Sequence, residues 1–354
     1  MFLDCFGNTN SSGRHFPVFE NAYHRFSLAD MRKSTNNFHK KRLIGRGGYG
    51  ELYKGYLQHI DGASDYAVAV KRFKVKRWEV LKTEIELLCQ LRHRNIISVV
   101  GFCNHRKEKI IVYQYLSNGS LYQKLVAGKL SWIKRLEICT SVARALNYLH
   151  AESQCTIIHR YINPRNILLD DNMQPILAGF ELAVQVFPST PKPMQLKNVE
   201  GTIGYIAPEH LKDGTISDKS DVYSFGVILL EVVWGRTIFY MTGSENYLEK
   251  PVEEDIDPNI KGNIAPGCWQ VVIDIAQRCL KHEPEERPTM HEVDLRLQHA
   301  LLLQAQADIS NPFGDYIIMS NTIINPHENI IKKVETDSYC MPEDVSDLED
   351  TLSG

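Results

Sequence analysis

The 354-residue sequence lacks the features that define several large classes of protein. No apolar run reaches the roughly 18 residues that a membrane-spanning helix needs, and the opening MFLDCFG lacks the basic start and long apolar stretch of a signal peptide. Lys and Arg number 40 against 43 Asp and Glu, so no broad positive surface for nucleic acid is expected. We therefore expect a protein of the reducing cytosol that binds no nucleic acid.

Cysteine is present, but its spacing does not fit a metal or disulfide framework. The eight cysteines are scattered, without a C-x-x-C pair or the clustered Cys and His of a zinc site. N-myristoylation is excluded because Phe2 follows Met1, whereas Cys5 has apolar neighbours and is a candidate for acylation. Peripheral recruitment to a membrane therefore stays open.

Two patterns of apolar residues predict two different lobes. From Leu43 to Arg72, short apolar and β-branched runs alternate with glycine-rich or polar turns, which is typical of antiparallel strands. A single helix is expected at residues 78–91, before two more strand-like runs. Beyond the Asn118-Gly119 turn the apolar residues follow a 3.6-residue period. Helices are expected at residues 133–149, 221–234, 269–281 and 291–306. A short helix opened by a capping box of Ser27 and Asp30 is expected before the first lobe.

A glycine-rich stretch, IGRGGYGELYKG, runs from Ile44 to Gly55 between two predicted strands. Glycine there lets the backbone approach phosphates closely, although a glycine triplet alone is more often an ordinary hairpin. The stretch precedes a strand, which argues against a dinucleotide-binding fold. Downstream, the run Val-Ala-Val-Lys places Lys71 at a strand end, and Glu84 on the next helix is spaced to pair with it.

Four further motifs follow in a fixed order, HRYINPRNILLD, AGFELA, GTIGYIAPE and SDVYSFGVILLE. With the glycine stretch and Lys71, they resemble the ordered motifs of plant receptor-like protein kinases, a Pelle/IRAK-like class. The ending VDLRLQHALLLQAQADI looks like the cytoplasmic domains of malectin-like, FERONIA-type receptors. The resemblance implies an α+β, two-lobed protein-kinase fold with a small β-rich N-lobe and a larger helical C-lobe.

The resemblance also implies the domain organisation. Residues 26–306 are expected to form the kinase-like domain, with the N-lobe at about 38–116 and the C-lobe at about 117–306. Residues 1–25 are expected to be a flexible segment, and 307–354 a disordered, acidic tail. Because no extracellular domain or membrane helix is evident, we expect a stand-alone receptor-like cytoplasmic form.

Carried over position by position, the resemblance implies a site for ATP. The loop from Gly45 to Leu52 would cover the phosphates, Lys71 with Glu84 would form the ion pair, and Tyr113 to Leu116 would supply gatekeeper and hinge. Asn166 matches the asparagine that binds a second magnesium, and it is the one candidate metal ligand. The implied nucleotide-binding residues are Ile44, Gly45, Gly47, Gly48, Gly50, Leu52, Ala69, Lys71, Glu84, Tyr113, Gln114, Leu116 and Asn166.

Other matched positions imply structural roles. Arg287 is placed to pair with Glu209, which closes the activation segment. Leu88, His159 and Phe180 match three apolar side chains that stack between the lobes of active kinases. These residues inform the fold rather than the chemistry.

Three departures from the family pattern affect catalysis. Tyr161 stands where an aspartate would accept the substrate's hydroxyl proton, and a phenol with a pKa near 10 is no base at pH 7. Gly179 stands where the Asp-Phe-Gly aspartate would bind magnesium, and it offers no side-chain ligand. Asn163 replaces a lysine that would face the transferring phosphoryl group. No intact catalytic residue is therefore expected, and magnesium binding should be weak or absent.

Three interpretations follow for the function. The favoured one is a pseudokinase that works as adaptor, decoy or allosteric partner of a receptor-like kinase in plant signalling, in the cytoplasm or at the inner face of the plasma membrane. The alternative is a weak or unconventional serine/threonine kinase, in which Glu181 supplies a displaced metal ligand. A decaying receptor-kinase copy is the third, and the intact C-lobe motifs argue against it.

A regulatory role is open for the loop from Val184 to Glu200. This loop follows the metal motif, Gly179-Phe180-Glu181, which aligns with Asp-Phe-Gly. Ser189 and Thr190 precede a proline there, and the retained Arg160 could pair with a phosphate added by another kinase. The alternative is an ordinary exposed loop, because such residues are common in loops.

Overall fold

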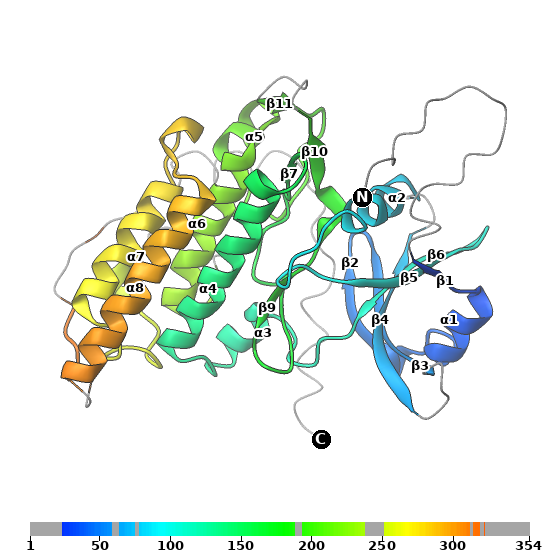
Figure 1. Ribbon diagram of the computed structural model, residues 1–354, viewed down its shortest axis with the longest axis horizontal. Coiled ribbons are helices and arrows are strands. Elements are labelled where there is room, and N and C mark those ends of the chain that lie inside the picture. The colour runs from blue at the N-terminus through cyan, green and yellow to red at the C-terminus, as the bar shows by residue number, and fades with distance from the viewer. Residues whose placement is uncertain are drawn as a thin grey trace, which may run out of the picture. The chain divides into compact units, whose positions relative to one another are not determined.

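The computed structural model describes residues 23–58, 64–74, 78–187, 193–237, 251–311, 314–318 and 322. These residues form two compact units (Figure 1). Unit 1 contains the described residues up to Leu91 and Ile97–Tyr115, and unit 2 contains Arg92–Ile96 and the described chain from Leu116 onward.

Unit 1 is built on a six-stranded sheet in the order β1-β5-β6-β4-β3-β2. The strands from β2 to β6 pair antiparallel, and β1 pairs parallel with the edge of β5. The strands are β1 (His24–Arg25), β2 (Leu43–Gly47), β3 (Gly50–Gln58), β4 (Asp65–Phe73), β5 (Val99–Asn104) and β6 (Lys109–Gln114). Strand β1 places residues 24 and 25 of the expected flexible segment at the edge of β5, and the expected flexibility of the rest of that segment lies outside the described residues.

Two helices accompany this sheet, α1 (Leu28–Ser34) and α2 (Trp78–Leu88). The predicted capping box at α1 is present, since the Ser27 hydroxyl accepts from the Asp30 amide and the Asp30 carboxylate accepts from the Ser27 amide at 2.8 Å. Met31 of α1 is fully buried against strand residues that include Tyr53 and Val70. A β-carbon on Gly55 of β3 would lie 3.2 Å from Oγ of Ser34, so glycine permits this close packing.

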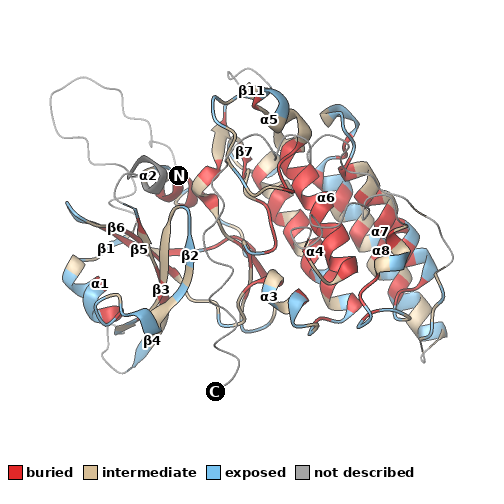
Figure 2. Cartoon of the chain, turned by 180° about the vertical axis from the view of Figure 1, so that it is seen from behind, coloured by how far each residue is buried: buried red, intermediate tan, exposed pale blue. Residues whose placement is uncertain are grey.

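Unit 2 is mainly helical, as predicted. Helices α4, α6, α7 and α8 lie side by side, and α6 is buried along nearly its whole length (Figures 1 and 2). The α-helices are α3 (Leu121–Val126), α4 (Trp132–Asn147), α5 (Pro208–Asp213), α6 (Asp218–Trp234), α7 (Pro266–Cys279) and α8 (Met290–Ser310). Helix α8 runs four residues past the predicted end at 306, and a capping box of Thr289 with Glu292 begins it.

Unit 2 also contains short pairs of strands, and both units contain short helical turns. β7 pairs with β10, β8 with β9, and β11 with β12, all antiparallel. The strands are β7 (Thr156–Ile158), β8 (Ile167–Leu169), β9 (Pro175–Leu177), β10 (Val184–Val186), β11 (Met194–Gln195) and β12 (Thr215–Ile216). The turns are η2 (Lys40–Arg42) in unit 1, and η4 (Tyr148–Glu152), η5 (Phe180–Leu182), η7 (Val252–Asp255) and η8 (Pro284–Glu286) in unit 2.

Candidate functional site

The glycine-rich stretch forms the tight turn between β2 and β3. Gly47 pairs with Gly50 across the turn. A β-carbon on Gly50 would lie 2.2 Å from the carbonyl oxygen of Arg72 on β4, so no other residue fits there without moving the strand. A β-carbon on Gly47 or Gly48 would meet nothing within 4 Å. The turn is therefore open at Gly47 and Gly48 and closely packed at Gly50.

The predicted ion pair between Lys71 and Glu84 is present in unit 1. Nζ of Lys71 on β4 lies 3.4 Å from Oε2 of Glu84 on α2, and the Glu84 side chain is only 1% exposed. The hydroxyl of Tyr113, at the end of β6, donates to the other oxygen, Oε1, at 2.6 Å. The buried carboxylate therefore receives hydrogen bonds from two strands, one from the Lys71 ammonium and one from the Tyr113 hydroxyl.

The implied nucleotide-binding residues fall in both units. Eleven of the thirteen lie in unit 1, on β2, β3, β4, α2, the end of β6 and the turn between β2 and β3, while Leu116 and Asn166 belong to unit 2. The structure brings Lys71, Glu84 and Tyr113 together. Nucleotide binding by the whole set stays a prediction.

In unit 2, one buried carboxylate holds the loop that begins at His159-Arg160-Tyr161, which we call the HRY loop. Asp221 on α6 accepts from the amide of His159 at 2.8 Å on Oδ2 and from that of Arg160 at 2.8 Å on Oδ1. The ring of His150 lies 2.9 Å from Oδ2. Burial alone would raise the pKa of Asp221, but hydrogen bonds from His150 and His159 outweigh it and leave that pKa below its ordinary value. The carboxylate is thus a charged anchor for the loop.

Arg160 sits at φ +64°, a conformation that non-glycine residues rarely adopt. The hydrogen bonds from the backbone amides of His159 and Arg160 to Asp221 hold the backbone around it. The Arg160 guanidinium donates to the carbonyl of Leu182 at 2.8 Å. Arg160 therefore connects the HRY loop to the segment after the metal motif.

His159 is fully buried, and burial lowers its pKa, so its ring is neutral near pH 7. Its Nε2 lies 3.1 Å from the carbonyl of Ala178, and its ring meets that of Phe180 edge-on at 4.6 Å. The predicted contact between His159 and Phe180 is therefore confirmed. Leu88 belongs to unit 1, and its place in the stack stays a prediction.

At the position of the catalytic base, the backbone of Tyr161 is occupied with structural bonds. Its carbonyl accepts from Nδ2 of Asn166 at 2.8 Å and from Nδ2 of Asn163 at 3.2 Å, and its amide donates to Nδ1 of His159 at 3.2 Å. The backbone thus keeps an ordered loop. The side chain at its tip is a half-buried phenol in place of a carboxylate.

Asn163, which replaces the expected lysine, organises the same loop. Its Oδ1 accepts from the amides of Arg165 at 3.0 Å and Asn166 at 3.2 Å. Its Nδ2 lies 3.4 Å from Oγ1 of Thr202, within the activation segment. The asparagine is 4% exposed. Sequence analysis predicted that a positive charge is lost at this position, but it missed that the Asn163 side chain holds the loop together. The preference of asparagine for turns could have indicated this role.

The asparagine at 166 and the glycine at 179 lie against each other. Gly179 adopts φ +85° and ψ +47°, and the Ala178 amide before it donates to the Asn166 carbonyl at 2.8 Å. A β-carbon on Gly179 would lie 2.5 Å from Cγ of Asn166. The amide side chain thus fills the space in which a metal-binding aspartate at 179 would begin.

The donors around this position do not suit magnesium. Mg²⁺ prefers carboxylate and other oxygen ligands in octahedral geometry. Nδ2 of Asn166 is engaged with the Tyr161 carbonyl, and Gly179 has no side chain. Within the described part of the chain, no group of three or more His, Cys, Asp or Glu is arranged to hold a metal ion. Asn166 and Gly179 therefore offer no carboxylate for the principal metal of a kinase, and weak or absent magnesium binding stays a prediction.

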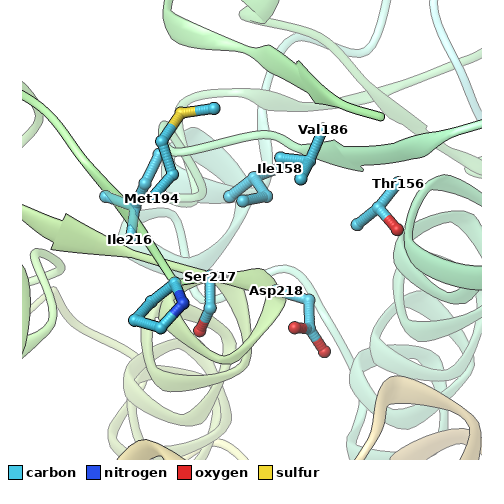
Figure 3. Close-up of a pocket in the computed structure, with 8 residues that line it drawn as sticks. Thr156, Ile158, Val186, Met194, Ile216, Ser217 and Asp218 are labelled. Carbon is cyan, nitrogen blue, oxygen red and sulfur yellow. The ribbon is translucent and has the colours of Figure 1, made fainter. Parts of the chain in front are cut away.

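The activation segment is held on both sides of residues 188–192, which the structure does not describe and which include Ser189 and Thr190. Before the gap, β10 pairs with β7, and after it β11 pairs with β12. Ile158 of β7, Val186 of β10 and Ile216 of β12 form a small buried cluster. Met194 packs on the cluster, beside a cavity of about 20 Å³ (Figure 3). That volume suits about one water molecule and no nucleotide or peptide.

The predicted pairing of Glu209 with Arg287 is confirmed. The guanidinium donates through both terminal nitrogens, each 2.8 Å from a different carboxylate oxygen. The same guanidinium donates to the carbonyls of Lys281, Lys219 and His282. This fully buried arginine joins the end of the activation segment to α6 and η8.

Comparison with known proteins agrees with the fold and the motifs. Residues 38–297 match the family of protein tyrosine and serine/threonine kinases, and the chain belongs to this family. Over most of its length it is similar to receptor-like protein kinases of Arabidopsis thaliana. It is 36% identical to ANXUR2 over 319 residues, 36% to HERK 1 over 304 residues and 33% to FERONIA over 332 residues.

These alignments cover 85%, 81% and 86% of this chain, and 36% of each relative. The chain therefore spans just over a third of the length of these relatives. The resemblance to receptor-like kinases and the two-lobed α+β fold class are confirmed. None of the helices that the structure describes is long and apolar enough to cross a membrane.

Proposed function

We propose that this protein is a pseudokinase that acts by binding, as adaptor, decoy or allosteric partner of a receptor-like kinase in plant signalling. One observation carries the proposal: Tyr161 and Gly179 replace the base and the metal ligand, while hydrogen bonds from the His159 amide to Asp221 and from Asn166 to the Tyr161 carbonyl still hold the loop. Loss of a general base commonly costs about 10²- to 10⁴-fold in rate, and loss of metal stabilisation costs several kcal/mol more. Turnover at a useful rate is not expected from what remains.

The retained framework supports a role in binding. The carboxylates of Asp221 and Glu209 still hold the loops that flank the site, and the Lys71–Glu84 ion pair persists. Losing one partner of such a buried polar contact costs stability. The presence of all these contacts therefore argues against a decaying sequence, in which such losses would accumulate. The surfaces of an ordered kinase domain are thus available for recognition.

The proposed nucleotide ligand is ATP, bound with little help from magnesium. The ammonium of Lys71 would pair with phosphate oxygens, and the glycine turn leaves room for them. When bound in a kinase, magnesium would offset the charge of the phosphates, and the contact between Asn166 and Gly179 argues against that ion here. ATP would then act as a structural ligand.

Thermal unfolding of the purified chain with ATP tests the nucleotide site, first in a chelator and then with Mg²⁺. A ligand at 100 times its Kd adds about 2.7 kcal/mol, which for a domain of this size raises Tm by roughly 5–10 °C. We expect the same shift in both buffers and no shift for Lys71→Met. Lys82→Met, a half-exposed lysine on α2, is the matched control and should shift like the natural chain.

Transfer of labelled γ-phosphate, measured in the same samples, separates the two functions. No incorporation into the chain or a generic substrate is expected. Magnesium-dependent incorporation that Lys71→Met abolishes would contradict the pseudokinase proposal and establish a weak or unconventional serine/threonine kinase instead. The retained Lys71–Glu84 pair and Asn166 are the features that favour this second candidate.

Partner binding needs its own measurement. The purified kinase domain of a receptor-like kinase that this chain resembles is assayed for peptide phosphorylation with increasing amounts of this protein. A saturable change in its rate is expected, and it should persist in Lys71→Met if the partnership needs no catalysis. An unchanged rate, with no complex detected by ultracentrifugation, would argue against this choice of partner class.

A further inference from the structure

The stretch between Asp30 and Glu51 carries charge of one sign only. It contains six Lys or Arg and no Asp or Glu, namely Arg32, Lys33, Lys40, Lys41, Arg42 and Arg46. Five of these cations lie within residues 32–42, which we call the basic segment. It runs from the last turn of α1 through η2.

The backbone of the basic segment is firmly built. Asn36, Asn37 and Phe38 all take positive φ, from 51° to 57°, so the chain turns sharply out of α1. The Phe38 ring packs edge-on against Tyr53 at 5.5 Å and lies 4.7 Å from the guanidinium carbon of Arg72. The segment is thus pinned to the sheet by an aromatic side chain between its two groups of cations.

The cations themselves face solvent. Arg32, Lys33, Lys40 and Lys41 are exposed, and no carboxylate of the described residues pairs with the side chains of Arg32, Lys40 or Lys41. Arg42 lies over the exposed ring of Tyr56, 4.6 Å from its centre. Unpaired like charges on a fixed backbone repel one another, and an anionic ligand would relieve that repulsion.

A matching anionic segment exists in the same chain. Residues 334–354 contain seven acidic residues and no Lys, Arg or His: Glu335, Asp337, Glu343, Asp344, Asp347, Glu349 and Asp350. These residues lie outside the described part of the chain, and their composition alone gives them a charge opposite to that of the basic segment. We propose that the acidic run 335–350 binds the basic segment 32–42 of the same molecule. This interaction is independent of the pseudokinase proposal, since it needs neither nucleotide nor catalysis.

Chain length and tethering favour this occupant over a free anion. Thr322 is fixed in unit 2, where its carbonyl accepts from the amide of Val252 at 3.0 Å. The 13 residues from there to Glu335 can span up to about 45 Å, more than the diameter of a small domain. A tethered ligand acts at an effective concentration of about millimolar, so a weak ionic contact suffices. Salt should weaken it, because the Debye length falls to about 3 Å at 1 M.

Zero-length cross-linking of the full chain tests the proposal. A water-soluble carbodiimide joins lysine amines to carboxylates in contact, and trypsin then releases residues 334–354 as one peptide because Lys333 is the last cleavage site. Mass spectrometry should find this peptide attached to Lys33, Lys40 and Lys41. The exposed lysines Lys212, Lys261 and Lys281 of unit 2 are internal controls. Raising NaCl from about 0.05 to 0.5 M should reduce the yield at least threefold.

Arginine variants keep the lysine reporters in place. Arg32→Gln with Arg42→Gln should lower the yield several-fold, whereas the exposed pair Arg94→Gln with Arg106→Gln should leave it unchanged. Equal thermal unfolding of both variants shows that folding is not the cause. Cross-links spread evenly over the control lysines, or none at all, would overturn the proposal. Mixed ¹⁴N/¹⁵N samples exclude a second copy, because cross-linked pairs of mixed isotope would also overturn it.

Discussion

Asn166 lies so close to Gly179 that a β-carbon on the glycine would be 2.5 Å from the asparagine's Cγ. Asn166 is held there, since its Nδ2 donates to the Tyr161 carbonyl at 2.8 Å and its own carbonyl accepts from Ala178. The Asn166 side chain therefore occupies the space that a β-carbon at position 179 would need. A side chain introduced at position 179 would clash with Asn166.

Gly179→Ala measures the cost of filling that space. The substitution places a side chain at positive φ and forces Asn166 to move, so we expect a loss of about 1–3 kcal/mol in the free energy of unfolding. Gly47→Ala is the matched control, because its β-carbon would meet nothing within 4 Å, and it should cost less than about 0.5 kcal/mol. Denaturant titration measures both.

The double variant Gly179→Ala with Asn166→Ala decides whether the two residues are coupled. If the asparagine is the obstacle, its removal should recover part of the loss, with a coupling energy of about 0.5–3 kcal/mol in a double-mutant cycle. Strict additivity of the two single effects would show that positive φ alone accounts for the cost.

Tyr113→Phe removes the hydroxyl that donates to Glu84 at 2.6 Å and leaves the Lys71 contact in place. Taking one donor from a carboxylate that is 1% exposed should cost about 1–3 kcal/mol of stability. Tyr56→Phe, at an exposed position, should be close to neutral. Equal stability of both variants would mean that water replaces the phenol on Glu84.

The motifs predicted the fold and the pairs that follow from periodicity and family position. Residues 221–234 are apolar nearly all round, which predicts a buried helix, and α6 is one. Lys71 with Glu84 and Glu209 with Arg287 were also predictable, because each carries charge at a matched position.

Contacts that depend on exact packing could not be predicted. The bond from Tyr113 to Glu84 joins residues 29 positions apart and needs the register of β6 against β4. The approach of Asn166 to Gly179 depends on a glycine conformation that composition does not reveal. Strand β1 is two residues long, too short for any periodic signal.

Glu209→Gln tests how much the buried ion pair with Arg287 contributes. Arg287 is fully buried and Glu209 nearly so, and removing one charge leaves the other without full compensation, so we expect a loss of about 3–5 kcal/mol. Asp274→Asn makes the same chemical change in the exposed pair with Arg296, and it should cost less than about 1 kcal/mol. Chemical denaturation compares the two, and similar losses would mean that solvent reaches Arg287.

Acid is expected to destabilise the protein through a buried histidine that sequence analysis did not single out. His210 on α5 is 4% exposed, and its pKa is lowered to about 4, first by burial and then by the nearby Arg160 guanidinium. Glu209 and a hydrogen bond with the Asn198 backbone act in the opposite direction and are outweighed. The folded protein therefore keeps this imidazole neutral at pH values where the unfolded chain protonates it.

The sign of the effect follows from proton binding. Between pH 6.5 and about 4, the unfolded chain holds more protons on His210 than the folded chain, so the free energy of unfolding falls as the pH drops. At pH 5 this histidine should account for about 2 kcal/mol of the loss relative to pH 7.

His210→Gln should remove that part of the fall, whereas His282→Gln, at an exposed position, should keep it. Denaturant titrations at pH 7 and pH 5 measure the difference, and because buried His159 titrates in the same direction, some pH dependence should persist in both variants. An unchanged fall in His210→Gln would assign the acid sensitivity to His159 and the HRY loop instead.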